Sequence, residues 1–349
     1  MELNSIIFPA PNSERISDLS KYKEELFYIP KKEHGSNNVT GYIPVMFHNC
    51  RKTVDSNKYL IYFHGNAEDI FNSNYTVDLT RTVLPYNSLS VEYPGYSVYN
   101  GEKSSKTIET DSLIVYDFLV NEVGILEEDI VICGRSIGSG PSIFLCSQRK
   151  PGGLILISPF TSIGEVVKNI VGFMKFIIKD RFQNINLIEN VLCPILFIHG
   201  QKDDIVPFNH SIELSKKCKC PYEIILPDEM DHNEIHIYDD FLEPVTSFLQ
   251  RHNLLEINND INKGNNEIKI QEEVIDKKLS LNDKLEKYNT LNSNEKKFGN
   301  NNSHKKEKFK KLLIDSKYFE VPESMKNIEN KGNKDILTSF VRRIFNIQH

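Results

Sequence analysis

The sequence has no tryptophan, no long apolar run and no excess of basic residues. Its 349 residues include 42 Lys+Arg and 48 Asp+Glu, for a formal net charge of −6. This balance gives no whole-chain argument for nucleic-acid binding, so we expect no such partner. No apolar run reaches the roughly 20 residues of a membrane-spanning helix, and we expect no integral membrane segment. The length suffices for one large α/β domain with an appendage.

Cysteine is too sparse and too irregularly spaced for a disulfide framework. Cys133, Cys146 and Cys193 lie in apolar segments and are typical of small core residues, which favours a reducing compartment. Cys218-Lys-Cys220 is half of a metal site at most, because no second Cys/His pair accompanies it and structural zinc needs four ligands. We therefore expect neither a metal nor a cofactor. The other cysteine is Cys50.

The N-terminus also lacks the signals that direct a chain elsewhere. Met1–Asn4 shows neither the basic region nor the apolar core of a signal peptide. Glu2 stands where N-myristoylation needs glycine. We expect a soluble, cytoplasmic protein.

What the sequence does contain, from about residue 25 to 251, is an alternation of short apolar runs and helical patterns. Such alternation predicts βαβ units, a mostly parallel sheet flanked by helices and right-handed crossovers. A polar loop at 33–38 predicts that the first two strands form an antiparallel hairpin. We expect strands at 25–29, 40–48, 59–63, 88–93, 130–133, 153–158, 194–199 and 222–226, and helices ending near 84 and covering 106–123, the stretch after 140, 208–217 and 234–251.

The composition changes abruptly near His252. Residues 253–333 are rich in Asn, Lys, Glu, Asp and Ser, and cannot bury enough apolar area to offset their chain entropy. We expect a domain at 1–252 followed by a mostly disordered tail. Residues 334–349 carry an apolar face and Arg342-Arg343, which predicts either an amphipathic helix docked on the domain or peripheral contact with the cytosolic face of a membrane.

The chain is organised around Gly134-Arg-Ser136-Ile-Gly138, which lies between a β-branched apolar run and a helical pattern. Gly-x-Ser-x-Gly in this context is typical of a nucleophile elbow, a sharp strand-to-helix turn that presents a serine. The two glycines fit because a Cβ at either position would collide with the neighbouring strand or helix. This pattern makes Ser136 the candidate nucleophile, with Ser139 and Ser158 as rivals.

An acid and a histidine follow in the order Ser, Asp, His, each just after a predicted strand. The carboxyl ends of parallel strands bring residues remote in sequence together, and this is the order of the α/β-hydrolase triad. We therefore expect Asp203 as the acid and His232 as the base. Asp204 is the rival acid. The rival histidines are His64, His199, His210 and His236, of which the first two end strands beside glycine and are typical of structural packing.

The oxyanion hole should consist of two backbone N–H groups. One belongs to Ile137, directly after the candidate nucleophile, and the other to Asn66 in the turn after His64-Gly65.

The stretch 160–190 is too long for a single crossover helix and is predicted to be a short helical cap. Its apolar residues exceed what one helix buries against a sheet, so some should face the space above Ser136 and enclose an apolar chain. The alternative is that they pack the cap onto the core. Our candidate pocket residues are Phe173, Met174, Phe176 and Ile177.

Several motifs resemble the α/β-hydrolase domain proteins that act as protein depalmitoylases. They are His64–Ala67, Glu92–Tyr96, Gly134–Gly138, Ile198–Asp203 and Asp231–Ile235, with further likeness at 41–47 and 7–11. The resemblance covers about residues 5–250. It implies an α/β-hydrolase fold, the roles given above for Ser136, Asp203 and His232, and palmitoyl-cysteine thioesters as substrate.

The chain departs from that family at three places. There is no cysteine before Cys50, where the depalmitoylases carry an acylated N-terminal cluster; Arg135 replaces a usual glutamine, and Asp231 a glycine. We expect a serine hydrolase that cleaves a fatty-acyl ester or thioester of a protein or lipid. The alternatives are a lipid or small-ester carboxylesterase, a serine peptidase, or an inactive hydrolase fold used as a binding scaffold.

Overall fold

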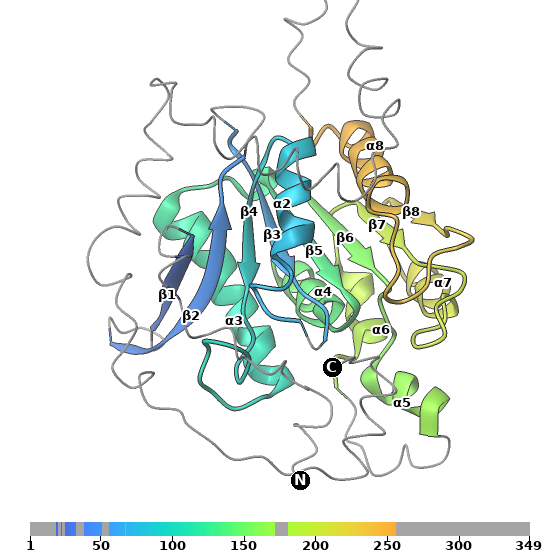
Figure 1. Cartoon of the computed structure of the whole chain (residues 1–349), viewed down its shortest axis with the longest axis horizontal. Coiled ribbons are helices and arrows are strands. Elements are labelled where there is room, and N and C mark those ends of the chain that lie inside the picture. The colour runs from blue at the N-terminus through green and yellow to red at the C-terminus, as the bar shows by residue number, and fades with distance from the viewer. Residues whose placement is uncertain are drawn as a thin grey trace, which may run out of the picture.

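The computed structural model describes residues 19, 22, 25–32, 38–50, 56–66, 68–171 and 181–255. Within these residues eight strands form one mixed, mostly parallel sheet of order β1-β2-β4-β3-β5-β6-β7-β8 (Figure 1). The predicted fold class is confirmed, including the antiparallel hairpin, in which Leu26 of β1 lies opposite Met46 of β2. The strands are β1 Leu26–Lys32, β2 Val39–His48, β3 Lys58–Phe63, β4 Tyr86–Val91, β5 Ile130–Arg135, β6 Gly153–Ile157, β7 Ile195–Ile198 and β8 Tyr222–Ile225.

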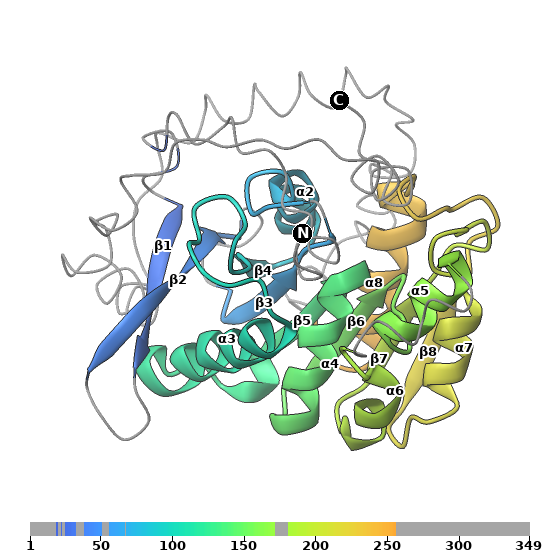
Figure 2. The same ribbon diagram turned by 90° about the horizontal axis from the view of Figure 1, so that it is seen from below.

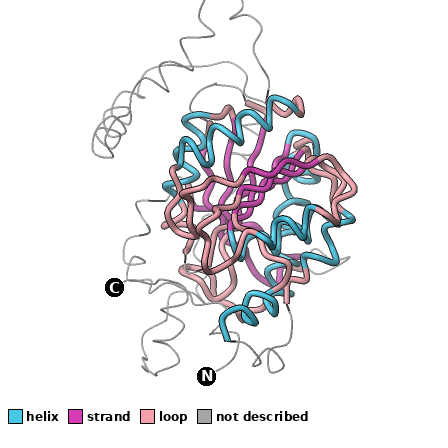
Figure 3. The backbone as a smooth tube through the Cα atoms, turned by 90° about the vertical axis from the view of Figure 1, so that its right-hand side faces the viewer, coloured by secondary structure: helices cyan, strands magenta, loops and turns pink. Residues whose placement is uncertain are grey.

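Helices cover both faces of the sheet (Figures 2 and 3). On one face lie α2 and α8, and on the other α3, α4 and α7 (Figure 2). The helices are α2 Asn74–Val83, α3 Ser105–Asp117, α4 Ser139–Gln148, α5 Ile163–Val171, α6 Asn184–Leu187, α7 Asn209–Ser215 and α8 Glu243–Arg251, with π-helical segments at Phe118–Val123 and Ile237–Leu242 and 3₁₀ turns at Glu127–Asp129, Ser136–Gly138 and Ile188–Asn190.

The central strands are buried on both faces because both carry apolar side chains. Along β3, Leu60 and Tyr62 pack with Val77 of α2 and Phe248 of α8. The alternate side chains of the same strand, such as Ile61, pack into the opposite cluster beneath α3 and α4. Parallel strands sandwiched between helices require such continuous apolar runs, which explains why the sequence pattern predicted them.

Parallel pairing brings the carboxyl ends of β3, β5, β6 and β7 to one edge of the sheet. Phe63 is opposite Gly134, Arg135 is opposite Ile157, and Ile157 is opposite Ile198. The loops that follow these strands therefore meet, and they carry His64, Ser136 and Asp203. His232 follows β8, which pairs in parallel with β7 and ends at the same edge.

The insertion between β6 and β7 contains α5, α6 and the 3₁₀ turn at Ile188–Asn190. The candidate pocket residues Phe173, Met174, Phe176 and Ile177 lie outside the described residues, as does the tail beyond 255. Among the described helices, none combines the length and apolarity needed to cross a bilayer.

Candidate active site

Ser136 sits on a strained turn between β5 and α4. Its φ is +50°, a left-handed conformation that a residue with a side chain rarely adopts. A Cβ on Gly134 would collide with Ser142 Oγ and the Gly138 carbonyl. A Cβ on Gly138 would collide with the Phe63 carbonyl and lie 2.9 Å from that of His64. The two glycines therefore let the chain reverse tightly against the end of β3.

The three candidate triad side chains form one hydrogen-bonded chain. His232 Nε2 lies 3.0 Å from Ser136 Oγ, and His232 Nδ1 lies 2.7 Å from Asp203 Oδ2. Because the carboxylate can only accept, Nδ1 carries the ring proton and Nε2 is left to accept from the serine hydroxyl. All three residues are at most 9% exposed, so little water competes for these bonds.

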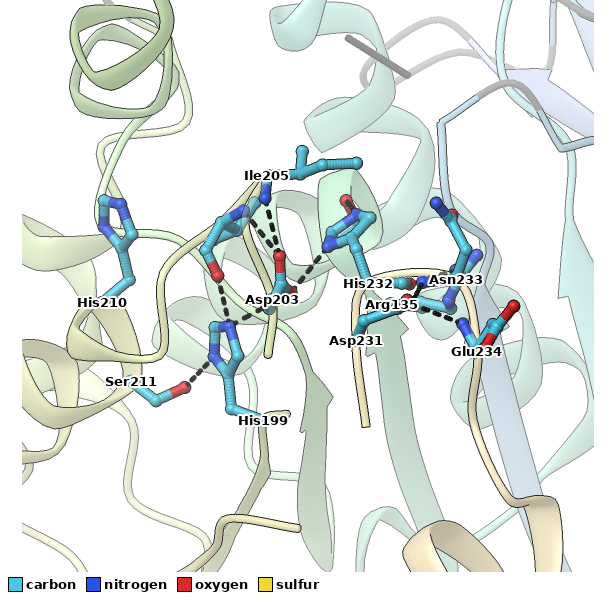
Figure 4. A network of polar contacts seen from close by, with 12 residues as sticks. Arg135, His199, Asp203, Ile205, His210, Ser211, Asp231, His232, Asn233 and Glu234 are labelled. Carbon is cyan, nitrogen blue, oxygen red and sulfur yellow. Dashed lines mark hydrogen bonds and ion pairs between the residues drawn. The ribbon is translucent and has the colours of Figure 1, made fainter. Parts of the chain in front are cut away.

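Asp203 is held by four donors. Its Oδ1 accepts from the backbone N–H groups of Ile205, at 3.1 Å, and Val206, at 2.7 Å. Its Oδ2 faces His232 and also His199 Nε2, which is 3.4 Å away (Figure 4). Burial raises the pKa of this carboxyl, but the hydrogen bonds from His199 and His232 outweigh burial and hold the pKa well below its ordinary value.

His199 is a contributor that the sequence reasoning treated only as structural packing. Besides facing Asp203, its Nε2 lies 2.7 Å from the Val206 carbonyl, and its Nδ1 lies 2.7 Å from Ser211 Oγ. With two acceptors at Nε2, that nitrogen carries the proton, and Nδ1 accepts from the Ser211 hydroxyl. The signal in the sequence that could have indicated this role is the position of His199, directly after β7 and four residues before Asp203.

Asp231, a departure from the family pattern, shapes the turn that carries His232. Its Oδ1 accepts from the backbone N–H groups of Asn233 and Glu234, each at 2.7 Å. An aspartate that caps two N–H groups in this way stabilises a tight turn without glycine.

His64, directly after β3, forms a further histidine–carboxylate pair with Glu92, directly after β4. His64 Nε2 lies 3.1 Å from Glu92 Oε1 and His64 Nδ1 lies 2.9 Å from the Gly65 carbonyl, with both side chains fully buried. Burial lowers the pKa of His64, but the hydrogen bond and charge of Glu92 outweigh it, so the pKa is raised. Two acceptors at the two ring nitrogens call for the doubly protonated imidazolium.

The loop after β3 also holds Asn66, one of the two residues expected to supply oxyanion N–H groups. Tyr96 donates to Asn66 Oδ1 at 2.8 Å, and Tyr93 donates to the His64 carbonyl at 2.7 Å. The close approach of Gly138 to the His64 carbonyl brings this loop against the turn that contains Ile137. The role of the two N–H groups remains a prediction.

The rival residues lie in other environments. Ser139 is buried and accepts from Asn184 Nδ2 at 3.4 Å, while Asp204 is exposed. His210 Nδ1 lies 2.9 Å from Thr161 Oγ1. Within the described residues no group of three or more His, Cys, Asp or Glu side chains is arranged to hold a metal ion.

Comparison with known proteins places the chain among hydrolases. It is 31% identical to human α/β-hydrolase domain-containing protein 17B over 211 residues, which are 60% of this chain and 71% of that protein. It is 30% identical to α/β-hydrolase domain-containing protein aho-3 of Caenorhabditis elegans over 190 residues, or 54% of this chain and 57% of that protein. No family model matches the chain.

Solved structures agree on the fold. The Pyrococcus furiosus esterase Pf2001 superposes with a TM-score of 0.51 at 17% identity, over 65% of this chain and 89% of that one. The 2,6-dihydroxy-pseudo-oxynicotine hydrolase superposes with a TM-score of 0.50 at 12% identity, over 66% of this chain and 68% of that one. The sheet order, the strained elbow and these relatives agree, and the chain belongs to the α/β-hydrolase domain-containing protein 17 family of α/β-hydrolases.

Proposed function

We propose that this hydrolase is a serine hydrolase that cleaves esters or thioesters through an acyl-enzyme. Ser136 is the nucleophile, His232 the general base and acid, and Asp203 the residue that fixes the histidine. The observation that carries the proposal is the continuous hydrogen-bonded chain from Ser136 Oγ through His232 to Asp203, with donor–acceptor distances of 3.0 and 2.7 Å.

In the first half of the reaction Ser136 Oγ attacks the substrate carbonyl carbon while its proton passes to His232 Nε2. The negative charge that develops on the carbonyl oxygen is stabilised by hydrogen bonds that the N–H groups of Ile137 and Asn66 donate to it. The tetrahedral intermediate collapses, the bond to the leaving thiol or alcohol breaks, and His232 returns the proton to that group. The acyl chain is now esterified to Ser136.

In the second half water attacks the acyl-enzyme. His232 Nε2 takes a proton from water, a second tetrahedral intermediate collapses, and the fatty acid leaves as Ser136 regains its proton. Asp203 stabilises the imidazolium that forms in both halves. Its pKa, held below the ordinary value by its histidine neighbours, keeps it charged at neutral pH.

The substrate we propose is a fatty-acyl thioester on a protein, with a lipid ester as the nearest related substrate. The family resemblance supports S-palmitoylated proteins as the substrate. The location that we propose is the cytoplasm or, peripherally, the cytosolic face of a membrane. The apolar excess of residues 160–190 supports an acyl chain, since each buried methylene contributes about 0.8 kcal/mol.

A hydrolysis screen tests this proposal. Matched thioesters and oxygen esters, from acetyl through octanoyl to palmitoyl, are assayed with wild type and Ser136→Ala. We expect kcat/KM to rise from acetyl to octanoyl, thioesters to be preferred, and Ser136→Ala to be inactive on all. A profile that is flat or falls with acyl length favours a small-ester esterase or a peptidase, and no turnover by wild type favours a binding scaffold.

The cap is tested in the same screen. Placing Asp at Phe173 or Phe176 should flatten the rise with acyl length because a buried carboxylate opposes an apolar chain. Turnover of the acetyl ester should not fall. If the ratio of kcat/KM for the octanoyl substrate to kcat/KM for the acetyl substrate is unchanged, these side chains do not line the acyl pocket.

A further inference from the structure

A mostly buried ion pair lies directly behind the candidate nucleophile. Arg135, the residue before Ser136, contacts Glu68 Oε1 through Nη1. The arginine side chain is 13% exposed and the glutamate 28%. Burial lowers the pKa of Arg135, but the charge of Glu68 outweighs it and raises the pKa, so the guanidinium stays charged. The proposed mechanism uses neither residue.

The outer ends of this pair make two further contacts, one within the loop after β3 and one to the loop after β8 that carries His232, here called the histidine loop. Glu68 Oε2 accepts from the backbone N–H of Gly65 at 2.9 Å, in the loop that continues to Asn66. Arg135 Nη2 donates to the backbone carbonyl of His232 at 2.8 Å. One carboxylate and one guanidinium therefore join the loop after β3, the elbow and the histidine loop (Figure 4 shows Arg135 beside His232).

The arrangement depends on the geometry of arginine. A guanidinium is a planar fork that donates to two acceptors in fixed directions, whereas a lysine ammonium cannot reproduce this fork. Gly65 leaves room for it, because a Cβ there would lie 2.7 Å from Arg135 Nη1. The contact is also made to the main chain of His232, so it fixes the position of that residue independently of the hydrogen bonds its ring makes.

Other contacts within the described residues order the histidine loop internally and tie it to the segment after β7. The turn at Asp231 orders residues 231–234 internally, but it does not attach them to the elbow. Lys202 N–H donates to the Met230 carbonyl at 3.1 Å, which ties the loop to the segment after β7. Within the residues that the structure describes, the Arg135 bond links the main chain of His232 to the elbow itself.

We propose that Arg135 and Glu68 are positioning residues that set the distance of His232, and the orientation of the loop carrying Asn66, relative to Ser136. This inference rests on the proposed serine-hydrolase function. Because a misplacement of about 1 Å costs roughly 100-fold in rate, loss of the pair lowers kcat. It leaves KM nearly unchanged, since neither residue belongs to the proposed acyl pocket.

A cavity beside the pair makes a direct test feasible. It has a volume of about 220 Å³ and is lined by Glu68 and Arg135 together with apolar side chains that include Tyr62, Ile157, Ile235 and Phe241. Truncation of Arg135 would enlarge this cavity at the place of the guanidinium. A small guanidinium cation in solution then has a site in which to replace the lost group.

The experiment measures kcat and KM for a water-soluble ester with full-length wild type, Arg135→Ala, Arg135→Lys and Glu68→Gln, with and without methylguanidinium. We expect Arg135→Ala to lose about 100-fold in kcat with KM within about twofold. Methylguanidinium should restore kcat saturably, and tetramethylammonium, which cannot donate a hydrogen bond, should not. The kcat values of Arg135→Lys and Glu68→Gln should lie between those of wild type and Arg135→Ala.

Arg149→Ala is the matched control. Arg149 forms a two-bond pair with Asp117, at 2.7 Å for each bond, away from the site. We expect wild-type kcat from it and no response to methylguanidinium. Circular dichroism monitors folding, and the Lys and Gln variants keep the test informative where the alanine variant is unstable.

Two failures can be told apart. The positioning role is overturned if Arg135→Lys and Glu68→Gln keep wild-type kcat, or if methylguanidinium does not reverse a loss of kcat in Arg135→Ala. In either case fluorophosphonate still labels Ser136 of wild type. Absence of that label on wild type would overturn the proposed function and, with it, this inference.

Discussion

His232 and His64 are buried at the same edge of the sheet and each contacts a carboxylate, but they differ in what faces the second ring nitrogen. His232 has Asp203 at Nδ1 and the Ser136 hydroxyl at Nε2. His64 has Glu92 at Nε2 and the Gly65 carbonyl at Nδ1. A hydroxyl can give up a proton and a carbonyl cannot. The His232–Asp203 pair is therefore suited to proton transfer, whereas the His64–Glu92 pair is suited to holding a fixed charge in the structure.

The difference teaches that a histidine–carboxylate contact does not by itself identify a catalytic base. Both imidazoles are less than a tenth exposed, and both carboxylates lie near 3 Å. The ring of His64 also packs on Tyr93, with centroids 4.0 Å apart, which fixes it further. Nε2 of His232, the ring nitrogen that does not face Asp203, lies against the hydroxyl of Ser136, which is held in a strained conformation.

We expect the largest loss of kcat when Ser136 or either residue of the His232–Asp203 pair is substituted. Ser136→Ala, His232→Ala and Asp203→Asn should each lower kcat by about ten-thousand-fold while the protein stays folded. These groups act as a unit, so combined substitutions should cost little more than the worst single one. Steady-state kinetics with a soluble ester checks this, and Ser136→Ala retaining more than about a hundredth of wild-type kcat would contradict the assignment.

Breaking the other pair should lower stability and spare the chemistry. Glu92→Gln leaves the imidazolium of His64 buried without its counter-charge, and removing one partner of such a pair costs about 3 kcal/mol or more. We expect a lower midpoint in urea denaturation, with kcat per folded molecule within about tenfold of wild type. A stable Glu92→Gln protein that has lost turnover would instead assign this pair to catalysis.

The charge of His64 should also appear as a pH dependence of stability. Its folded pKa is raised above the ordinary 6.5, so the pair contributes fully below pH 6.5 and its contribution is lost as the pH rises through the folded pKa. The stability difference between wild type and His64→Gln should therefore shrink as the pH rises above 6.5. Urea denaturation at several pH values measures it, and a difference that grows with pH would show that His64 is buried neutral.

The smallest effect is expected at Asp204, the neighbour and sequence rival of Asp203. Asp204 is exposed, whereas Asp203 is 5% exposed and bonded to His232. Asp204→Asn should change kcat by less than about twofold, as surface substitutions usually do. A larger loss at Asp204 than at Asp203 would reverse the choice of acid.

The sequence predicted the sheet and the three residues that the structure brings together, because both depend on local patterns. Apolar runs such as β3 had to be strands buried on both faces, and Ser136, Asp203 and His232 each follow a strand. Strand ends in a parallel sheet meet at one edge, so their order along the chain was sufficient.

The Glu92–His64 and Arg135–Glu68 contacts were not predicted from the sequence. They depend on which strands are neighbours: β4 lies beside β3, and β3 beside β5, and strand order is not written in any local pattern. In the sequence, Arg135 stands out only as a departure from the family pattern. Long flexible side chains such as arginine and glutamate reach several partners, and only the assembled loops decide which one they bind.

The most direct test of the comparison is the site of covalent labelling. Full-length wild type, His232→Ala and His64→Gln are treated with a fluorophosphonate, and the adduct is located by peptide mass spectrometry. We predict one adduct on Ser136 in wild type and in folded His64→Gln, and strongly slowed labelling in His232→Ala. Labelling on another serine such as Ser139 or Ser158, or loss of labelling in His64→Gln but not in His232→Ala, would contradict the account.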